Sequence, residues 1–310
     1  MARERVATLR QVPPSEGNVV EVYPGDGLAA VATRYGAGTT FNVHGGDYLV
    51  SAPIVVSRGD VWKGIDPDGT RPCVRTTAKY VFFVPAEADY ATVRGLDVSG
   101  AVHDDRCEPD CGRGIGGPGS NLLVANVRSH HNENQGVGGT GPGLVIRNSE
   151  LDHNGSYDAT TGKVSAAGVK AVNSYSVFNS YIHNNYWDGA WCDIECERFE
   201  VHDSHVEYNG KAGIHYEIST GPAVFEGNTI TGNGYIIRST RRGGILIVDS
   251  SNARVYANTF GNNGFYQRAV EIANTSRAPA VSWVFIRDNT LNYDEHMGCN
   301  LPNVSCSHNR

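Results

Sequence analysis

One short turn motif recurs along most of this 310-residue sequence and constrains its fold more than any other feature. Each copy has an apolar residue that is followed three places later by Asn or Asp. The pairs are Leu151 with Asn154, Ile182 with Asn185, Val206 with Asn209, Ile230 with Asn233, Phe260 with Asn263, and Leu291 with Asp294. With Val127 and His130 as the upstream copy, the apolar position recurs after 24, 31, 24, 24, 30 and 31 residues. The repeating unit is therefore about 24 residues long, and some copies carry six or seven more in one turn.

The segments between these turns alternate apolar and polar residues and are rich in Val, Ile, Phe and Tyr, which is the pattern of a half-buried strand. One such unit cannot bury its apolar face alone. Successive units bury it when each strand pairs with the equivalent strand of the next coil. We expect the repeated Asn to form an inward ladder that satisfies backbone groups of the turns. A sandwich of hairpins is the alternative fold, but it predicts strands about every 8–12 residues and no longer constant period.

These coils resemble the right-handed parallel β-helix repeats of the pectin-lyase-like superfamily over residues 90–295. The resemblance implies an all-β fold, a single-stranded right-handed parallel β-helix that forms one domain over residues 1–310. It also implies an N-terminal cap with the first coils at 20–90, regular coils at 91–295 and a C-terminal cap at 296–310. In the N-terminal part, "GDGLAAVATRYGAG", Gly27–Tyr35 would be a short amphipathic helix that closes the end of the barrel. The superfamily includes pectate and alginate lyases, epimerases, glycosidases, phage tailspikes and adhesins, so the resemblance implies a carbohydrate-active type without choosing one activity.

The charge and the apolar content exclude two classes of partner. The formal net charge is −7 and the isoelectric point is near 5.9, with Lys and Arg scattered, so we expect no nucleic-acid partner. No apolar run approaches the roughly 18 residues that span a membrane, so we expect no membrane partner. The oligomeric state cannot be read from the sequence.

The cysteines bear on where the protein works. Three close pairs occur, and Cys73 is left over; the pairs are Cys107 with Cys111, Cys192 with Cys196, and Cys299 with Cys306. Their spacings differ and the pairs are far apart, which favours disulfides over a zinc site. Pairing between near neighbours is the simplest connectivity. We therefore expect an extracellular or periplasmic protein, although the N-terminus "MARERVATLRQV" lacks the apolar core of a signal peptide.

The repeat also assigns the side chains of one set of strands. After each Asn turn a small residue opens a strand, and the next residue is apolar and expected to point inward; these residues are Val169, Ala190, Ile214, Ile245 and Val270. Strand alternation then points the following residue of each coil outward. This first outward row comprises Lys170, Trp191, His215, Leu246 and Glu271. A second outward row lies two places on and comprises Val172, Asp193, Glu217, Val248 and Ala273. By the same alternation Cys192 and Tyr216 point inward.

Two carboxylates of the second row are the candidate catalytic residues. Asp193 and Glu217 lie on adjacent coils, so their backbones should be about 4.8 Å apart. Two ionised carboxylates at about 5 Å repel by roughly 1–3 kcal/mol, which should raise the pKa of one of them. A protonated acid beside an ionised carboxylate is what cleavage of a glycosidic bond needs. We therefore expect Asp193 and Glu217 to be catalytic, with His215 assisting.

The neighbours of this pair are predicted to bind the substrate. Trp191 would be an apolar plate for a sugar ring, and Lys170 would meet an acidic or hydroxyl group of the sugar. Glu195 follows Asp193 on the outward side, and Ser219 holds the same place beside Glu217. The other candidates are Glu271, at the end of the first row, and Arg241, in the long turn insertion 234–242; a second insertion, 155–167, would form the other wall of a groove.

A second polar cluster contains the histidines near the Asn ladder: His130, His131, Asp152, His153 and His183. Histidine–carboxylate sets of this kind bind metals. However, the ladder position already explains a polar requirement there, so we expect no metal. The loop 103–114, which holds Asp104, Asp105 and Arg106, is interpreted as an ordinary solvated loop tied by a disulfide.

Three functions compete at this point. The first is a glycoside hydrolase that cleaves a polysaccharide or oligosaccharide with Asp193 and Glu217 and needs no cofactor. The second is a polysaccharide lyase or uronate C5-epimerase with His215 or Lys170 as base, in which Asp193, Glu195 and Glu217 hold Ca²⁺. The outward positions contain no Arg to neutralise a uronate, which counts against the second function. The third is a non-enzymatic glycan-binding β-helix.

Overall fold

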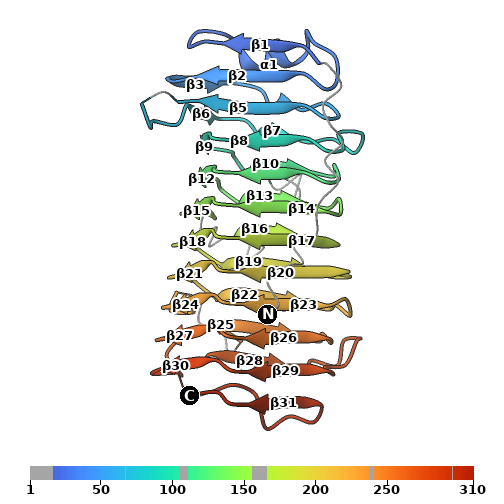
Figure 1. The fold of residues 1–310 in the computed structure, drawn as a ribbon, viewed down its shortest axis with the longest axis vertical. Helices are drawn as coiled ribbons and strands as arrows, with labels where there is room; N and C mark the ends of the chain where they lie inside the picture. The colour runs from blue at the N-terminus through green and yellow to red at the C-terminus, as the bar shows by residue number, and fades with distance from the viewer. Residues whose placement is uncertain (1–16, 67, 105–110, 156–165, 237–240, 295) are drawn as a thin grey trace, which may run out of the picture.

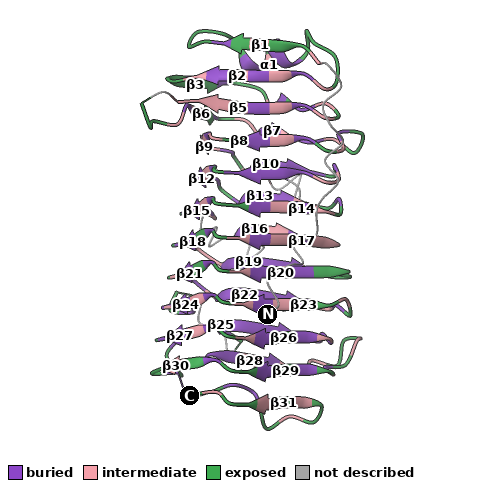
Figure 2. Ribbon diagram, in the orientation of Figure 1, coloured by how far each residue is buried: buried purple, intermediate pink, exposed green. Residues whose placement is uncertain are grey.

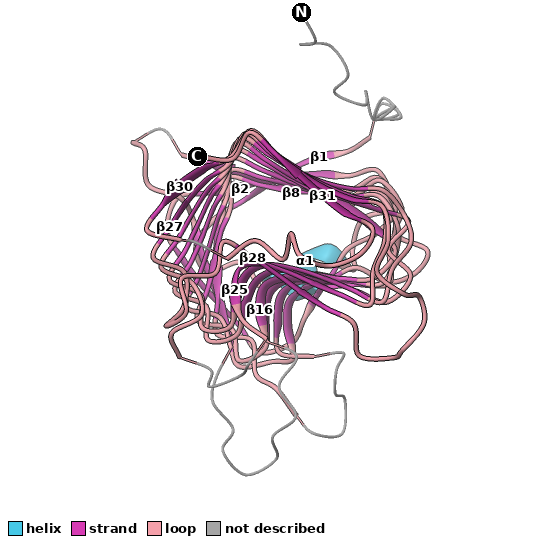
Figure 3. Ribbon diagram, turned by 90° about the horizontal axis from the view of Figure 1, so that it is seen from below, coloured by secondary structure: helices cyan, strands magenta, loops and turns pink. Residues whose placement is uncertain are grey.

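The structure is a computed structural model that describes residues 17–66, 68–104, 111–155, 166–236, 241–294 and 296–310. The strands of these residues form three parallel sheets, to which successive coils contribute one strand each (Figure 1). Viewed along the long axis, the three sheets enclose the interior on three sides (Figure 3). This arrangement confirms the predicted parallel β-helix.

The sheets are named A, B and C. Sheet A contains β1 (Val19–Val22), β2 (Thr40–His44), β5 (Val61–Ile65), β8 (Thr92–Arg94), β11 (Leu123–Ala125), β14 (Leu144–Arg147), β17 (Ser174–Phe178), β20 (Arg198–His202), β23 (Ala223–Glu226), β26 (Ala253–Tyr256), β29 (Val284–Arg287) and β31 (Val304–Ser307). Sheet B contains β3 (Asp47–Val50), β6 (Cys73–Thr76), β9 (Asp97–Ser99), β12 (Arg128–His130), β15 (Glu150–Asp152), β18 (Tyr181–His183), β21 (His205–Glu207), β24 (Thr229–Thr231), β27 (Thr259–Gly261) and β30 (Thr290–Asn292). Sheet C contains β4 (Ile54–Val55), β7 (Tyr80–Phe83), β10 (Arg113–Gly117), β13 (Gln135–Gly139), β16 (Ala167–Ala171), β19 (Asp188–Asp193), β22 (Ala212–Glu217), β25 (Gly243–Val248) and β28 (Val270–Ala273).

The interior is built from side chains that occupy the same place in successive coils. The five residues predicted to point inward from sheet C, namely Val169, Ala190, Ile214, Ile245 and Val270, are all 0% exposed, which confirms the prediction. Sheet C differs from sheet A on its outer side. All six positions of β25 are buried, whereas β29 alternates between buried and exposed positions (Figure 2). The outward face of sheet C is therefore buried along part of its length. Its polar side chains have little access to water, so they depend on hydrogen bonds and ion pairs within the protein.

A ladder of buried side chains runs through the turns that follow sheet B. Asn209 Nδ2 donates to Asn233 Oδ1 and to the backbone oxygen of Ile182, both at 3.0 Å. Its Oδ1 accepts from Asn185 Nδ2 at 2.9 Å and from the Asn185 backbone at 3.2 Å. The rungs of this Asn ladder are Asn132, Asn154, Asn185, Asn209, Asn233, Asn263 and Asp294. The predicted inward ladder is confirmed, and it satisfies backbone groups that the turns leave without strand partners.

The first rung corrects the predicted register of one coil. Ser129, and not Val127, pairs with Leu151, and Asn132, and not His130, donates to Asn154 Oδ1 at 2.9 Å. The rungs Asn132 and Asn154 are 22 residues apart, so this coil is shorter than predicted. The register predicted from the sequence was wrong for this coil because a serine stands at a position that is apolar in the other copies.

The two ends of the stack differ in part from expectation. The helix α1 (Leu28–Ala32) is shorter than the predicted Gly27–Tyr35, and it lies at the N-terminal end, within the outline of the coils (Figures 1 and 3). Its residues Leu28, Val31 and Ala32 are buried in the core. At the other end β31 pairs with β29 and continues sheet A. The capping roles of these two segments stay predictions.

In the described part of the chain, no helix is long and apolar enough to cross a membrane.

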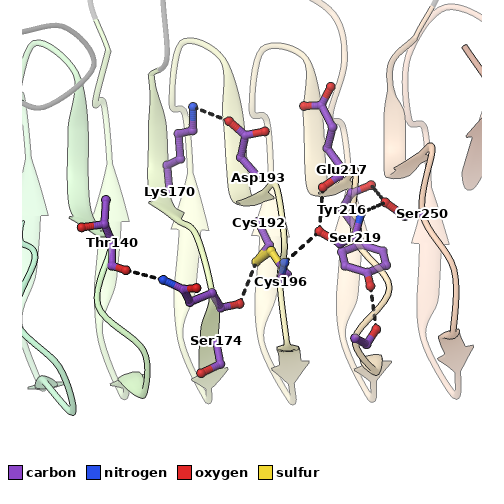
Figure 4. Close-up of a disulfide and its surroundings, with 12 residues drawn as sticks. Thr140, Lys170, Ser174, Cys192, Asp193, Cys196, Tyr216, Glu217, Ser219 and Ser250 are labelled. Carbon is purple, nitrogen blue, oxygen red and sulfur yellow. Dashed lines mark hydrogen bonds and ion pairs between the residues drawn. A yellow bond between two sulfur atoms is a disulfide. The ribbon is translucent and has the colours of Figure 1, made fainter. Parts of the chain in front are cut away.

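Two of the predicted disulfides are present. Cys192 bonds to Cys196 and Cys299 bonds to Cys306, so the near-neighbour connectivity is confirmed for both pairs. Cys192 points inward as predicted, and its disulfide joins the end of β19 to the next turn (Figure 4). Cys73 is a free thiol. Cys107 lies outside the described residues, and so does the predicted pair with Cys111.

The Asn ladder yields a stability prediction. We expect Asn209→Ala to lower the free energy of unfolding by about 2–4 kcal/mol, because it removes four hydrogen bonds and leaves buried partners on two neighbouring coils unsatisfied. Denaturant unfolding followed by circular dichroism measures this change. Asn300→Ala, at an exposed position, is the control and should leave the midpoint in place. Equal midpoints for the two variants would contradict a stabilising ladder.

Candidate functional site

The two predicted rows exist on the outward face of sheet C. In the pairing of β19 with β22, Trp191 lies opposite His215 and Asp193 opposite Glu217. Lys170 of β16 lies opposite Trp191 on the preceding coil. Leu246 and Glu271 continue the first row on β25 and β28. Figure 4 shows Lys170, Asp193 and Glu217 on one side of the sheet, with Cys192 and Tyr216 on the other, as the alternation predicted.

These rows form a largely covered layer outside the barrel. The side chain of His215 is 2% exposed, that of Glu217 is 14% exposed and that of Asp193 is 18% exposed. Beside them Leu246 and Val248 pack together in a small apolar cluster of their own. Charges in such a layer are only partly hydrated, so each depends on specific partners.

Trp191 has both ring faces occupied. Lys170 Nζ lies 3.6 Å from the centroid of the ring, and the His215 ring stacks on it with centroids 5.1 Å apart. Since Lys170 and His215 come from the coils on either side, they cover opposite faces of the indole. This geometry counts against the predicted role of Trp191 as a plate for a sugar ring.

The stacked carboxylates each have a cation of their own. Lys170 Nζ lies 2.9 Å from Asp193 Oδ2, and an Arg277 nitrogen donates to Glu217 Oε1 at 2.6 Å (Figure 4 draws the first pair). Burial alone would raise the pKa of Glu217. The charge of His215, the hydrogen bond from Arg277 and the charge of Lys211 outweigh burial and hold this pKa below its ordinary value. The prediction of a raised carboxyl pKa is therefore wrong for Glu217, because the sequence did not reveal these cations.

Arg277 connects two coils at the edge of the layer. It lies in the loop after β28, and besides Glu217 it donates from Nε to Asp249 Oδ2 at 2.9 Å. Burial works to raise the pKa of Asp249, but hydrogen bonds from Thr275 and Arg277 lower it overall. With 44% of its side chain exposed, Arg277 is the outermost member of this group.

The core of the site is an ion pair that the sequence reasoning missed. Asp188, the first residue of β19, is fully buried, and its Oδ2 lies 3.3 Å from Lys211 Nζ and 3.1 Å from His215 Nδ1. Burial would raise the pKa of Asp188, but the charges of Lys211 and His215 lower it overall. Asp188 is thus ionised and can only accept hydrogen bonds. His215 Nδ1 carries the proton in the tautomer that donates to Asp188, and Lys211 Nζ lies 3.2 Å from the same atom.

In that tautomer the other ring nitrogen, Nε2, carries the lone pair. His215 Nε2 lies 3.5 Å from Glu217 Oε2 and, among the described residues, has no hydrogen-bond partner. Three further buried polar atoms nearby in sequence share this condition: Trp187 Nε1, Asp188 Oδ1 and Trp191 Nε1. An unsatisfied buried polar group costs about 1–3 kcal/mol, and such groups call for an explanation in catalysis or binding. Their concentration around β19 and β22 marks this place as the candidate site.

Of the other predicted site residues, Glu195 and Ser219 lie outside this layer. Glu195 lies in the turn after β19, where it is exposed and has a left-handed φ of 55°. Ser219 is buried, and its Oγ accepts from the Cys196 backbone at 3.0 Å, so the prediction that it points outward beside Glu217 is wrong. The physical reason is that β22 ends at Glu217 and Ile218 has a left-handed φ of 46°, which breaks the strand alternation before Ser219.

Glu271 and Arg241 lie at the C-terminal end of the first row. Glu271 pairs with Arg268 at 2.6 Å and with His296 at 3.4 Å. Burial raises the pKa of Glu271, and the charges of Arg268, His296 and Arg241 offset only part of that effect. The predicted walls of a groove, in the insertions 155–167 and 234–242, fall largely on residues outside the described part of the chain.

A trace of the missed residues was present in the sequence. Asp188 stands where the equivalent strands have Ala167 and Ala212, so a carboxylate replaces a methyl group once the register is known. Lys211 follows a turn glycine and precedes Ala212. Arg277 had no such signal, because its loop belongs to no repeat.

The histidine cluster on sheet B forms an ion-pair network. Glu150, Asp152 and His183 offer ligand atoms within 4.8 Å of one another. Arg128 already donates two hydrogen bonds to Asp152, at 3.0 and 2.9 Å, and lies 3.7 Å from Glu150. His153 Nδ1 is a further partner of Asp152, at 2.8 Å. A guanidinium thus supplies the positive charge that these carboxylates require, and the absence of a resident metal stays a prediction.

Comparisons with known proteins agree with this fold. A family model described as "Right handed beta helix region" matches residues 90–260 and 164–306. The structure of the pectate lyase Pel9A is 17% identical, with a TM-score of 0.57 over 87% of this chain and 82% of that chain. PfbA, a surface adhesin of Streptococcus pneumoniae, is 12% identical, with a TM-score of 0.59 over 89% of this chain and 77% of that one. A variant of the periplasmic alginate epimerase AlgG is 14% identical, with a TM-score of 0.56 over 87% and 73%. A search of curated proteins gives no match, and these identities show the fold alone.

The lowered pKa of Glu217 predicts a pH-dependent effect of one substitution. The folded pKa lies below the ordinary value of 4.5, so ionised Glu217 contributes stability that is present above that value and is lost as the pH falls through the folded pKa. Glu217→Gln should therefore reduce the free energy of unfolding near about pH 5, and by less toward about pH 3. Urea unfolding at a series of pH values measures this difference. Glu197→Gln, at an exposed position, is the control. A difference that stays flat or grows in acid would contradict the charge pairing.

Proposed function

This chain belongs to the right-handed β-helix family, and on that basis we propose that it is a carbohydrate-active enzyme. Two of the similar structures are a pectate lyase and an alginate epimerase, and the third is an adhesin. An enzyme is favoured over a binding protein by the unsatisfied buried polar atoms of the site, which call for an explanation in catalysis or binding. The substrate is a polysaccharide or oligosaccharide.

The reaction is the removal of a proton beside the carboxylate of a uronic acid residue, as in a lyase or a C5-epimerase. One observation carries this choice: buried Asp188 fixes His215 by Nδ1, so that Nε2, which lacks a hydrogen-bond partner, is the acid–base atom. A histidine oriented in this way is the side chain most often used as a general base near neutral pH. Asp188 is a positioning residue, because it acts through His215.

The cations of the site suit an acidic substrate. Negative charge develops on the uronate carboxylate when the neighbouring proton leaves, and Arg and Lys stabilise such charge. Arg277 is the outermost cation and already binds a carboxylate, that of Glu217. A substrate carboxylate that takes Arg277 from Glu217 frees the Glu217 side chain to move away from His215 Nε2. This exchange opens the base to the substrate and supplies the Arg that the outward strand positions lack.

The hydrolase predicted from the stacked pair has less support. It requires one protonated carboxyl group, whereas the pKa of Glu217 is lowered and Asp193 is paired with Lys170. The residues present do not fit a Ca²⁺ site either. Asp193 and Glu217 already have cationic partners, and Glu195 lies in an exposed turn. We therefore propose that the activity does not depend on Ca²⁺.

The two disulfides support an oxidising location, because such bonds are rare in the reducing cytosol. We propose an extracellular or periplasmic protein on that ground.

The experiment that tests the function uses the full chain with a panel of polyuronates and neutral polysaccharides, with and without chelator. An unsaturated uronate, detected by its ultraviolet absorbance, identifies a lyase, and deuterium taken up from D₂O without chain cleavage identifies an epimerase. Reducing ends without the unsaturated product would instead establish the hydrolase and overturn proton abstraction. Binding without any conversion would establish a glycan-binding protein. Loss of activity in chelator would contradict the metal-free proposal.

A substitution at the base gives the sharpest prediction. We expect His215→Ala to lower kcat on the converted polyuronate by about 10²–10⁴-fold, which is the usual contribution of a general base. His205→Ala, at an exposed position on sheet B, is the matched control and should retain activity. Initial rates under saturating substrate measure both. Retained activity in His215→Ala, with the fold intact by circular dichroism, would sink the assignment of the base.

A further inference from the structure

A row of side chains leads out of the candidate site along the long axis of the molecule. The residue after each ladder Asn donates its backbone N–H to the ladder Asn of the preceding coil: Gly210 to Asn185 at 2.9 Å, Gly234 to Asn209 at 2.8 Å and Gly264 to Asn233 at 2.6 Å. These turns therefore stack coil on coil. The Lys211 backbone donates to Trp187 of the preceding coil at 2.7 Å, and the pairing of Ala212 with Gly243 sets Arg242 opposite Lys211 on the next coil. Tyr235 and Phe265 follow the stacked turn residues Gly234 and Gly264. Ring contacts agree with this order. Lys211 Nζ lies 5.4 Å from the Trp187 ring centroid, and the centroids of Tyr235 and Phe265 are 5.1 Å apart.

The two halves of this row differ in exposure. Trp187 and Lys211 belong to the covered site, where Lys211 contacts Asp188 and His215. The other half opens to solvent: Tyr235 is 41%, Ile236 50%, Phe265 63% and Tyr266 62% exposed. We call these four residues the aromatic platform. A single exposed ring needs no explanation, but a contiguous group beside a functional site marks a binding surface.

Two arginines hold the rings of the platform in place. The Arg242 guanidinium lies 5.0 Å from the Phe265 centroid and 5.4 Å from that of Tyr266, and Arg268 lies 5.2 Å from the Tyr266 centroid. Cation–π contacts of this kind orient the rings. Arg241 lies near Glu271 and offsets part of the rise in the pKa of that carboxyl group. The contacts of Arg242 and Arg268 thus fix the rings of Phe265 and Tyr266.

We propose that the aromatic platform binds the continuation of an acidic oligosaccharide whose reacting residue lies at His215. The exposed rings contact the C–H faces of the sugars. The choice of ligand rests on the proposed function, whereas the platform itself is defined by its own contacts.

The geometry of the solenoid adds a requirement on substrate length. Lys211 and Phe265 are two coils apart, which is about 10 Å along the axis. One sugar at His215 therefore does not reach Phe265, but a longer chain that follows the row does. The platform should contribute to the binding of long oligouronates and not to that of short ones.

The test measures dissociation constants by calorimetry for uronate hexamers and dimers and for a neutral hexamer, in a His215→Ala background that prevents conversion. We expect the double variant Phe265→Ala/Tyr266→Ala to lose about tenfold or more in affinity for the uronate hexamer. Its affinity for the dimer should be unchanged, and binding of the uronate hexamer should weaken with rising salt. Phe285→Ala, an exposed ring on sheet A, is the matched control and should bind as the parent does. Phe265→Trp should retain affinity, and thermal unfolding checks that each variant is folded.

The outcomes separate this proposal from the proposed function. Equal affinity of the double variant and its parent for the uronate hexamer would overturn the platform, even if the chain converts polyuronates. Equal binding of neutral and acidic hexamers would overturn the acidic nature of the bound chain. A hexamer that binds with the expected dependence on Phe265 and Tyr266 but is not converted by the unsubstituted chain would keep the platform and overturn the enzyme. Absence of hexamer binding to the unsubstituted chain would overturn the platform outright.

Discussion

The buried Asn ladder fixes which residues of successive coils face one another, and every other feature of the molecule depends on that register. Asn185 and Asn209 are joined by hydrogen bonds across a separation of 24 residues, so the segments between them superimpose without an insertion. Side chains alternate between the two faces of a strand, so a slip of one residue would turn Trp191 and His215 inward and bring Cys192 and Tyr216 to the surface. The pairing that gathers the site is therefore a consequence of turn hydrogen bonds that lie outside it.

The site behaves as one layer of matched charges. Its carboxylates are Asp188, Asp193, Glu217 and Asp249, and its permanent cations are Lys170, Lys211 and Arg277. With a neutral His215 the sum is one negative charge, and in the proposed reaction the proton that His215 accepts from the substrate brings the sum to zero. In a partly dehydrated layer, pairing of opposite charges stabilises the folded protein, because water solvates each unpaired charge poorly. The same pairing explains why the predicted repulsion between Asp193 and Glu217 does not raise the pKa of Glu217: each carboxylate has a cation of its own.

The fold and the two outward rows could be predicted from the sequence, because a constant period converts residue numbers into positions in space. The prediction failed at Ser129 and Asn132, where a polar residue at an apolar place hid the register. It also failed for the surroundings of Glu217, because Arg277 comes from a loop without a repeat. The role given to Trp191 assumed an open ring face, and only side-chain geometry reveals that Lys170 and His215 cover both faces. Periodicity thus gives the position of a side chain but not its partners or the direction of its pKa.

The division between strands and turns has a consequence for specificity. Strands of sheet C must keep their register. The outward side chains of successive coils therefore differ in type but not in position, which gives them a fixed geometry. Turns can lengthen without moving that register: the rungs Asn233 and Asn263 are 30 residues apart, against 24 for the preceding pair, and they remain hydrogen-bonded. The longer coil is the one that carries Tyr235 and Arg242. Its extra residues lie in the turn that forms part of the platform, and β22 and β25 remain paired. In the proposed function, the covered strands therefore hold the reacting groups, and the turns of variable length provide the surface that binds the rest of the substrate chain.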